Sequence, residues 1–372
     1  MNGSEYASDA VLRQSLLVDA KGGLSSFREL INPLLARYIE EAVAEARKED
    51  ELIAEALEQS GKIILSGGKR LRAALMCAGY FAAGGTDEER ILSTSMSIEL
   101  THAFLLIHDD IIDRDPLRHG VETIHEHFEQ VARRSFPGTD PVHFGNSIGI
   151  IVGDMVAAFG NDVIFRSGFP LPRVFESLSM LQKIISYTVI GQGMDIALEY
   201  KRKASKDDIL RMYEYKTAKY TIEGPLVLGA LLAGASEELV ASLRRFAVPL
   251  GVAFQIRDDI LGTFGTREKL GKPVESDLEE GKRTILTYFA LERSSAAMKR
   301  EIEELLERHA PSQVDVERFR ALLRETGALD SSSEYMVQLV EESKREICAA
   351  GIPADAERFL VSVADYVSER AF

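Results

Sequence analysis

The 372-residue chain has no tryptophan, only two cysteines and no uninterrupted apolar run long enough to cross a membrane. Cys77 and Cys348 cannot build a disulfide framework or a structural zinc site by themselves, so we expect both to be ordinary buried residues. Glu5 and Asp9 lie where a signal peptide would be basic. These absences predict a cytoplasmic protein without a transmembrane segment.

Basic residues are outnumbered by acidic ones, 44 against 59, which leaves a net charge of −15. Such a charge opposes general binding to nucleic acid or to anionic membranes. A hydrophobic content of 45% argues against disorder. Apolar residues recur every three or four positions, and no series of alternating strands is evident, so we predict an all-α fold with ten or more helices around one core. The clearest helical runs are residues 33–59, 91–113, 174–201, 206–221, 237–261 and 314–325.

The chain reads as one domain with a polar arm in front of it. Residues 1–24 are mixed and polar and predict a flexible arm, and residues 25–372 predict a single helical domain. Residues 135–141 are rich in turn formers and predict a surface loop. Residues 262–284 hold four glycines, one proline and many charges, so we interpret this connection as a candidate lid.

A first acidic motif follows an apolar helical run and consists of Asp109, Asp110 and Asp113. On a helix these side chains lie within one turn of one another, and a position near the helix C-terminus makes the crowding of anions still less favourable. Magnesium ions would offset both effects. An isolated motif of this kind is more often a solvated acidic patch, but the apolar run before it and the basic groups after it favour a metal site. His102, two turns earlier, shares the helix face with Asp109 and is either a core histidine or a substrate contact.

A second acidic motif lies about 150 residues further along, where Gln255 precedes Asp258 and Asp259 by three and four positions. The amide and the acids therefore share a helix face, and Gly262 is expected to end the helix nearby. Alone this motif is weak. Together the two motifs predict facing carboxylates with cations between them, and such cations recruit phosphates.

Basic residues recur near turns. Residues 66–72 form a glycine-rich turn that opens a helix, and its backbone N–H groups with Lys69 and Arg72 could hold an anion, although a flexible turn with solvated charges explains it equally well. Four further cations are each more often surface charges when considered singly: Arg118, Lys216, Lys272 and Lys282.

Together these residues resemble the trans-isoprenyl diphosphate synthases, also called the polyprenyl synthetase family. The resemblance runs from about residue 66 to residue 284 as an ordered set of motifs: Gly-Gly-Lys-Arg-Leu-Arg at 67–72, Asp-Asp-Ile-Ile-Asp at 109–113 with Arg118 and Gly120, Gly153-Asp154, Gly-Gln-Gly-Met-Asp at 191–195, Lys-Thr-Ala at 216–218, Phe-Gln-Ile-Arg-Asp-Asp at 254–259, Gly-Lys-Pro at 271–273 and Gly-Lys-Arg-Thr at 281–284. It implies a large helical bundle around a deep cavity, usually a homodimer, that condenses isopentenyl diphosphate with an allylic diphosphate.

The resemblance also implies roles for individual residues. Asp109, Asp113 and Asp258 would be the principal ligands of magnesium, about three ions with manganese as a substitute, and Asp110 and Asp259 would be nearby ligands or orienters. The implied catalytic set is these five carboxylates with Lys216. The allylic diphosphate would be held by Arg118, Lys216 and Lys272, with Thr217, Gln255, Asp195 and Lys282 close by. Isopentenyl diphosphate would be held by Gly68, Lys69, Arg72 and His102.

Two positions depart from the family pattern. His119 stands where a second consecutive arginine is usual, which puts one isopentenyl diphosphate contact in doubt, and Gly262 replaces the third aspartate of the second motif. In the family, bulky residues four or five positions before the first motif limit chain growth, and here these are Leu105 and Phe104. The pattern resembles geranylgeranyl diphosphate synthases, which make a C20 product, whereas Phe104 could equally be a core residue. The alternatives are a farnesyl or longer-chain synthase, a terpene cyclase of the same fold, and a non-catalytic subunit of a two-component synthase.

Overall fold

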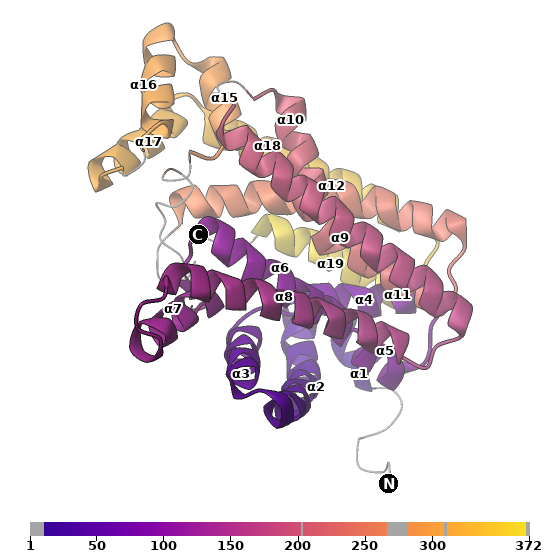
Figure 1. The fold of residues 1–372 in the computed structure, drawn as a ribbon. Helices are drawn as coiled ribbons and strands as arrows, with labels where there is room; N and C mark the ends of the chain where they lie inside the picture. Colours follow the sequence, from indigo (N-terminus) through magenta and orange to yellow (C-terminus); the bar gives the residue numbers. More distant parts are fainter. Residues whose placement is uncertain (1–10, 202–203, 266–277, 279–280, 309–310, 370–372) are drawn as a thin grey trace. The chain divides into compact units, whose positions relative to one another are not determined.

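The computed structural model describes residues 11–201, 204–265, 278, 281–308 and 311–369 (Figure 1). These residues form helices joined by short connections, and their only strands are two short ones, so the predicted all-α fold is confirmed. The chain divides into two compact units: unit 1 consists of residues 1–178 with 228–234, and unit 2 of residues 179–227 with 235–372. The single helical domain stays a prediction.

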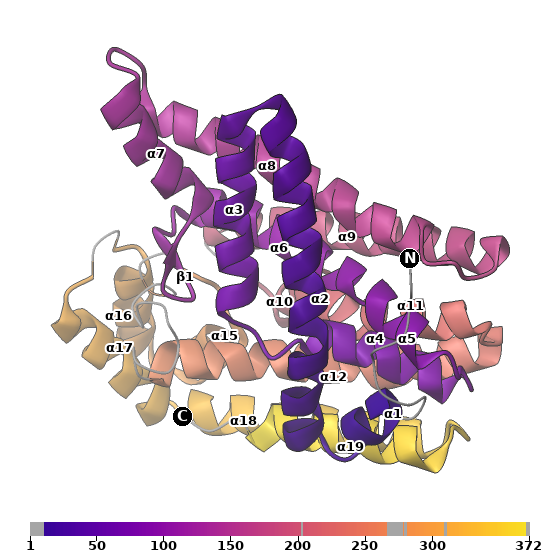
Figure 2. The same ribbon diagram turned by 90° about the horizontal axis from the view of Figure 1, so that it is seen from below.

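Unit 1 holds the first acidic motif. Its elements are α1 (Val11–Leu16), α2 (Ala20–Glu49), α3 (Glu51–Ser66), α4 (Leu71–Ala82), α5 (Glu88–Thr94), α6 (Met96–Asp113), β1 (Leu117–Arg118), β2 (Val121–Glu122), α7 (Ile124–Ser135) and α8 (Pro141–Phe165). The helices α2 and α3 lie side by side in Figure 2 and are joined at Asp50. The backbone of Asp50 is extended and its side chain accepts a hydrogen bond from Ile53 N, which splits the helical run expected at 33–59 into two.

The N-terminal segment differs from the expected arm. Residues 11–24 lie in α1 and the first turns of α2, where Leu12, Leu16 and Leu24 are buried. Gly23 allows this packing, because a Cβ there would lie only 2.1 Å from the carbonyl oxygen of Leu16. Three leucines among polar neighbours are enough to fold the segment onto the unit, which the overall polarity of residues 1–24 concealed.

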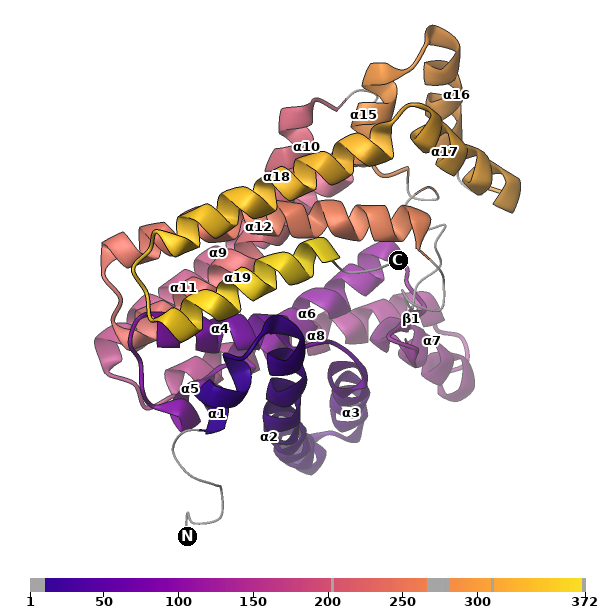
Figure 3. The ribbon, with the colours of Figure 1, turned by 180° about the vertical axis from the view of Figure 1, so that it is seen from behind.

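Unit 2 holds the second acidic motif. Its elements are α10 (Lys206–Tyr213), a π-helix η1 (Glu214–Glu223), α12 (Glu237–Phe264), α15 (Ile285–Arg293), α16 (Ala296–Leu306), α17 (Gln313–Glu325), α18 (Ala328–Cys348) and α19 (Ala354–Glu369). The helix α12 packs against η1, α18 and α19, and Figure 3 shows α18 and α19 beside it. Two further helices run from one unit into the other: α9 (Leu171–Glu199) and α11 (Gly224–Ala233).

Polar side chains begin most of these helices. Capping boxes pair Ser205 with Asp208 at the start of α10 and Ser312 with Asp315 at the start of α17. Among the residues that the structure describes, two helices, α8 and α12, are long and apolar enough to cross a membrane by length and composition alone, a test that a helix packed in a protein core also passes. The cysteines differ from expectation, because Cys77 is buried but Cys348 is exposed near the end of α18.

Candidate active site

The first acidic motif occupies the last turn of α6 in unit 1. The helix ends at Asp113 because Arg114 adopts a left-handed backbone conformation with φ of 57°. Its side chains have different surroundings: Asp110 is 1% exposed, whereas Asp109 and Asp113 are partly exposed. The adjacent carboxylates therefore cannot have the same role.

Asp110 is engaged by Arg118. The Nε atom of Arg118 donates to Asp110 Oδ1 at 2.7 Å, its Nη2 atom contacts the same oxygen, and Nη2 also donates to Asp115 at 3.1 Å. Burial alone would lower the pKa of Arg118, but Asp110, Asp109 and Asp115 outweigh it and raise that pKa. Arg118 therefore orients Asp110 and brings a fixed positive charge to the end of α6.

Arg118 lies on a short β-hairpin whose strands are two residues each. Strands β1 and β2 pair in antiparallel fashion, and the turn residues His119 and Gly120 have φ values of 52° and 78°. Positive φ at both turn positions is typical of the tight turn that suits the twist of a hairpin. The ring of His119 lies against Gly67, where a Cβ would come within 2.5 Å of the ring. The glycine-rich turn and the hairpin turn therefore meet within unit 1.

Buried Arg70 holds the glycine-rich turn in place. It donates to Asn32 at 2.8 Å, to the carbonyl oxygen of Ile64 at 2.6 Å and to Glu99 at 3.2 Å. The second carboxylate oxygen of Glu99 accepts from Ala73 N in the first turn of α4. This anchoring leaves Gly68 and Lys69 exposed at the helix start, which suits a predicted anion site.

Arg72 and His102 lie together within unit 1. The Nη1 atom of Arg72 is 3.2 Å from His102 Nε2. Burial, followed by the charges of Arg72, Arg118, His119 and Arg70, holds the pKa of His102 well below its usual range. The ring is therefore neutral near pH 7, and Nε2 can accept the hydrogen bond from Arg72.

The predicted chain-length residues precede the acids on α6. Phe104 is buried and its ring packs edge-on to that of His108, with centroids 5.2 Å apart, whereas Leu105 is half-buried. Gly153 of α8 makes room for His108, because a Cβ there would lie 2.3 Å from its ring. These contacts give Phe104 a packing role, and its effect on product length stays a prediction.

In unit 2 the basic residue of the Lys-Thr-Ala motif is paired with an acid. Lys216 forms an ion pair with buried Asp195 of α9. Gly191, one helical turn before Asp195, allows the two segments to approach, since a Cβ there would lie 2.2 Å from Lys216 N. The resemblance placed Lys216 and Asp195 near the same diphosphate, but it did not predict an ion pair between them.

The π-helix η1 carries Lys216 and Thr217. A π-helix is rare and frequently marks a functional site. Here it turns two adjacent side chains toward different helices: Lys216 contacts α9, and Thr217 donates to Gln255 of α12 at 2.5 Å. The helical run predicted at 206–221 thus consists of α10 followed by a segment of different register.

The second acidic motif shows the same division between adjacent acids. Asp259 is 6% exposed, and it accepts hydrogen bonds from Gln255 Nε2 at 2.8 Å and from the hydroxyl group of Tyr213. Asp258, one position earlier, is partly exposed. Gly262 lies in the last turn of α12, near the helix end as expected, and the helix closes at Phe264 before Gly265.

The predicted lid lies largely outside the described residues, and Lys272 lies there with it. Lys282 is described and is half-buried, two positions before Thr284, which caps the N-terminus of α15.

Three residues that hold the site were not predicted from the sequence: Arg70, Glu99 and Tyr213. A charged residue inside an apolar helical run, such as Glu99, was the one signal that could have found them.

The carboxylates suit a magnesium ion whose coordination shell is completed by substrate. No group of three or more His, Cys, Asp or Glu side chains forms a ready-made metal site within the described ranges. Magnesium usually takes one or two protein carboxylates and fills its shell with water and phosphate oxygens. Asp109 and Asp113 in unit 1 and Asp258 in unit 2 are partly exposed oxygen donors of this kind. The expected convergence of the two motifs stays a prediction.

Comparisons with known proteins place the chain among prenyl diphosphate synthases. Curated relatives include a geranylfarnesyl diphosphate synthase of Aeropyrum pernix, 32% identical over 314 residues that cover 83% of this chain and 92% of the relative. A geranylgeranyl diphosphate synthase of Saccharolobus solfataricus is 30% identical over 318 residues, 84% of this chain and 90% of the relative. A crystal structure of geranylgeranyl pyrophosphate synthase from Corynebacterium glutamicum, complexed with isoprenyl diphosphate and magnesium, has a TM-score of 0.88 at 31% identity and covers 94% of this chain and 99% of that one.

The family model described as polyprenyl synthetase matches residues 54–323, a range that includes the glycine-rich turn and both acidic motifs. From the match and the relatives together, we conclude that the chain belongs to the polyprenyl synthetase family.

Proposed function

We propose that this protein is a magnesium-dependent short-chain trans-prenyltransferase that condenses isopentenyl diphosphate with an allylic diphosphate to make geranylgeranyl diphosphate. The observation that carries the proposal is the difference in burial between the acids of each motif. One carboxylate of each motif, Asp110 or Asp259, is buried and held by neighbouring side chains, while Asp109, Asp113 and Asp258 are partly exposed. Such exposed oxygens, on rigid supports, suit ligands of a metal shared with substrate.

The residues of unit 2 are proposed to hold the allylic diphosphate. Lys216 supplies a positive charge whose direction is set by Asp195, and Thr217 and Gln255 present polar groups beside Asp259. Arg118 in unit 1 supplies a further cation. When bound, magnesium neutralises the negative charge that develops on the leaving diphosphate.

The residues of unit 1 are proposed to hold isopentenyl diphosphate. Lys69 and Arg72 lie at the start of α4, and neutral His102 contacts Arg72. In the reaction, the C–O bond to the allylic diphosphate breaks, the isopentenyl double bond attacks the allylic cation, and a proton is lost to give a longer allylic diphosphate. The departing diphosphate is our proposed base, and exclusion of water would protect the allylic cation from being quenched.

The C20 product is the finer part of the proposal. It is supported by Phe104 on α6, five positions before Asp109, and by relatives that are named geranylgeranyl diphosphate synthases. Other relatives are named geranylfarnesyl diphosphate synthases, so a C25 product is the main competitor.

We also propose a cytoplasmic homodimer. Large apolar side chains are exposed on α8, namely Val142, Ile150, Ile151 and Phe165. Only 39% of the most apolar 18-residue stretch of α8 is buried. A face of this kind suits a partner surface of the same chemistry, and a second copy supplies one.

One assay tests the activity. Purified protein is incubated with magnesium, labelled isopentenyl diphosphate and each allylic primer in turn, and the products are separated by length. Elongation to C20 is expected. Cyclised hydrocarbon formed without isopentenyl diphosphate would instead support a terpene cyclase, and turnover only after addition of another chain would support a non-catalytic subunit.

Replacement of one exposed carboxylate tests the metal assignment. Asp109→Ala should lower turnover by at least about 10³-fold, the scale of losing a major electrostatic stabiliser. Asp162→Ala is the matched control, because Asp162 of α8 forms an exposed ion pair with Arg166, which directly follows the helix, and its loss should be nearly neutral. Near-normal turnover of Asp109→Ala would count directly against the assignment.

A further inference from the structure

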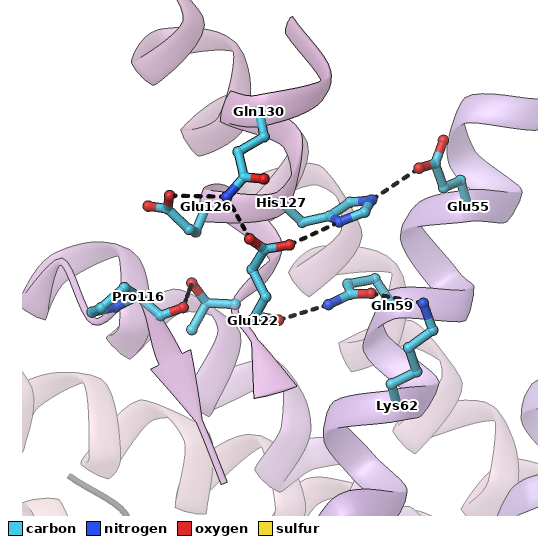
Figure 4. A network of polar contacts seen from close by, with 9 residues as sticks. Glu55, Gln59, Lys62, Pro116, Glu122, Glu126, His127 and Gln130 are labelled. Carbon is cyan, nitrogen blue, oxygen red and sulfur yellow. Dashed lines mark hydrogen bonds and ion pairs between the residues drawn. The ribbon is translucent and has the colours of Figure 1, made fainter. Parts of the chain in front are cut away.

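A cluster of polar contacts joins α3, α7 and the β-hairpin within unit 1 (Figure 4), and its members are not among the side chains assigned to substrate. The ring of His127 lies between two carboxylates: Nδ1 is 3.1 Å from Glu122 of β2, and Nε2 is 2.9 Å from Glu55 of α3. Gln59 of α3 donates to the backbone oxygen of Glu122 at 2.7 Å. Gln130 of α7 donates to the other oxygen of the Glu122 side chain at 2.5 Å.

These contacts hold Glu122 through both its backbone and its side chain. Its backbone oxygen and both carboxylate oxygens are engaged from two helices, so β2 cannot shift without breaking several bonds. A histidine suits the position between the two carboxylates, because its two ring nitrogens point in different directions and can contact Glu55 of α3 and Glu122 of β2 at the same time. Lys62 further fixes Gln59 through a hydrogen bond at 3.1 Å.

Each side of the cluster leads to one basic segment of the site. Strand β2 follows the turn at His119 and Gly120, and Arg118 directly precedes that turn, only a few residues from Glu122. The helix α3 runs on to Ser66, directly before Gly67, Gly68 and Lys69. The two segments touch where the ring of His119 meets Gly67. The spacing of the two basic segments therefore depends on how α3 and the hairpin are held together.

We propose that His127 is a positioning residue for the isopentenyl diphosphate subsite, acting through Glu122 and Glu55 to set the spacing between the hairpin turn and the glycine-rich turn. The inference rests on the proposed function, because it assigns a support to a subsite of that same reaction. The side chain of His127 is 20% exposed, and both ring nitrogens face the two glutamates, so its effect on the subsite is indirect. Supports of this kind hold binding groups in productive geometry and are felt as changes in affinity.

The test compares the kinetic constants for both substrates. His127→Ala should raise the KM for isopentenyl diphosphate by about fivefold or more, while kcat and the KM for the allylic primer stay within about twofold, because losing binding that is equal in the ground state and the transition state raises KM and leaves kcat unchanged. Glu55→Gln is the milder second variant and should raise the same KM by about twofold. It keeps the size of the side chain, so it tests the idea even if His127→Ala fails to fold.

The control is Arg133→Ala on the same helix, which removes an exposed pair with Glu129 and should leave both KM values unchanged. Unchanged KM for isopentenyl diphosphate in both variants, or an equal rise in both KM values, would overturn the inference. Absence of elongation by the wild-type protein would instead refute the proposed function, so the two failures are distinguishable.

Discussion

Tyr213 shows how a single hydroxyl group can serve three segments of unit 2. It is the last residue of α10 and is 1% exposed. Its hydroxyl group donates to Asp259 of α12 and accepts from Ile285 N, the first residue of α15, at 2.9 Å. Burial, followed by the charge of Asp259, raises the pKa of Tyr213 well above its usual value, so the hydroxyl group stays protonated and can donate. Tyr213 thus orients one acid of the second motif and satisfies a helix N-terminus.

Removing this hydroxyl group should cost both stability and turnover. Tyr213→Phe keeps the ring but leaves Ile285 N–H and an Asp259 oxygen without their partner, which should lower the free energy of unfolding by about 1–3 kcal/mol. Turnover should fall about tenfold, as for loss of a support to a metal-site group. Urea denaturation and steady-state assays measure the two effects. Tyr200→Phe is the control, since Tyr200 is 85% exposed, and equal behaviour of the two variants would contradict the role.

Product length should depend on Phe104. If its side chain is the floor against which the growing chain stops, Phe104→Ala should give products longer than those of the wild type. Chromatography of the dephosphorylated products measures this, with Phe136→Ala as the control because Phe136 is 41% exposed. An unchanged product distribution would leave Phe104 with its packing role alone. In either case the replacement leaves a cavity in the core and should lower the free energy of unfolding by about 3–5 kcal/mol.

At the scale of the element, the π-helix η1 has its own set of ion pairs. Lys219 contacts Glu214 at 3.0 Å and Glu223 at 3.1 Å, and Glu223 also pairs with Arg244 of α12 at 3.2 Å. Glu214 and Lys219 are five positions apart, the spacing of a π-helical hydrogen bond, whereas an α-helix favours pairs three or four apart. The ring of Tyr187 lies 5.4 Å from Lys219 Nζ. The Glu214–Lys219 pair therefore favours the π-helical register that turns Lys216 toward Asp195, and the other contacts hold Lys219 and Glu223 in place.

Lys219→Met therefore tests whether this register matters for substrate. Methionine keeps much of the side-chain length but loses the charge, so the ion pairs vanish and Lys216 loses its fixed direction. The KM for the allylic substrate should rise by about fivefold, as expected when a binding group is misplaced. Lys219→Arg should restore most of the affinity, and Lys183→Met is the control, because Lys183 also lies near Tyr187 but outside η1. Wild-type KM in Lys219→Met would show that the pairs are dispensable.

At the scale of the whole molecule, α8 has an exposed apolar face, which we propose that a second copy covers. Ile150 and Ile151 are 49% and 53% exposed. If a second copy covers this face, replacing both with lysine should give a monomer by light scattering after size-exclusion chromatography, because charges placed in an apolar interface are costly. Val337→Lys is the control on α18, where a single valine is 47% exposed. A dimer that survives the double replacement would place the interface elsewhere.

The helices were predictable wherever apolar periodicity was strong, as in α6 and α12, and both acidic motifs were found as parts of them. Their boundaries were less predictable, since Asp50 and Ser95 interrupt runs that look continuous. The register of η1 was not predictable, because its charge spacing is recognisable only once the ion pairs are known. Local patterns report which face of a helix is apolar, and they do not report the partners of polar side chains.

The amino-acid sequence alone determined the helical class of the protein, the membership of its motifs in one family and the identity of the candidate carboxylates. These follow from local order along the chain, which periodicity and spacing record directly. Only the tertiary structure decided which acid of each motif is buried and which stays partly exposed. The reason is physical: Arg118 reaches Asp110 by way of a hairpin, and Tyr213 meets Asp259 across 46 positions of chain, so each pairing depends on packing rather than on neighbours in sequence.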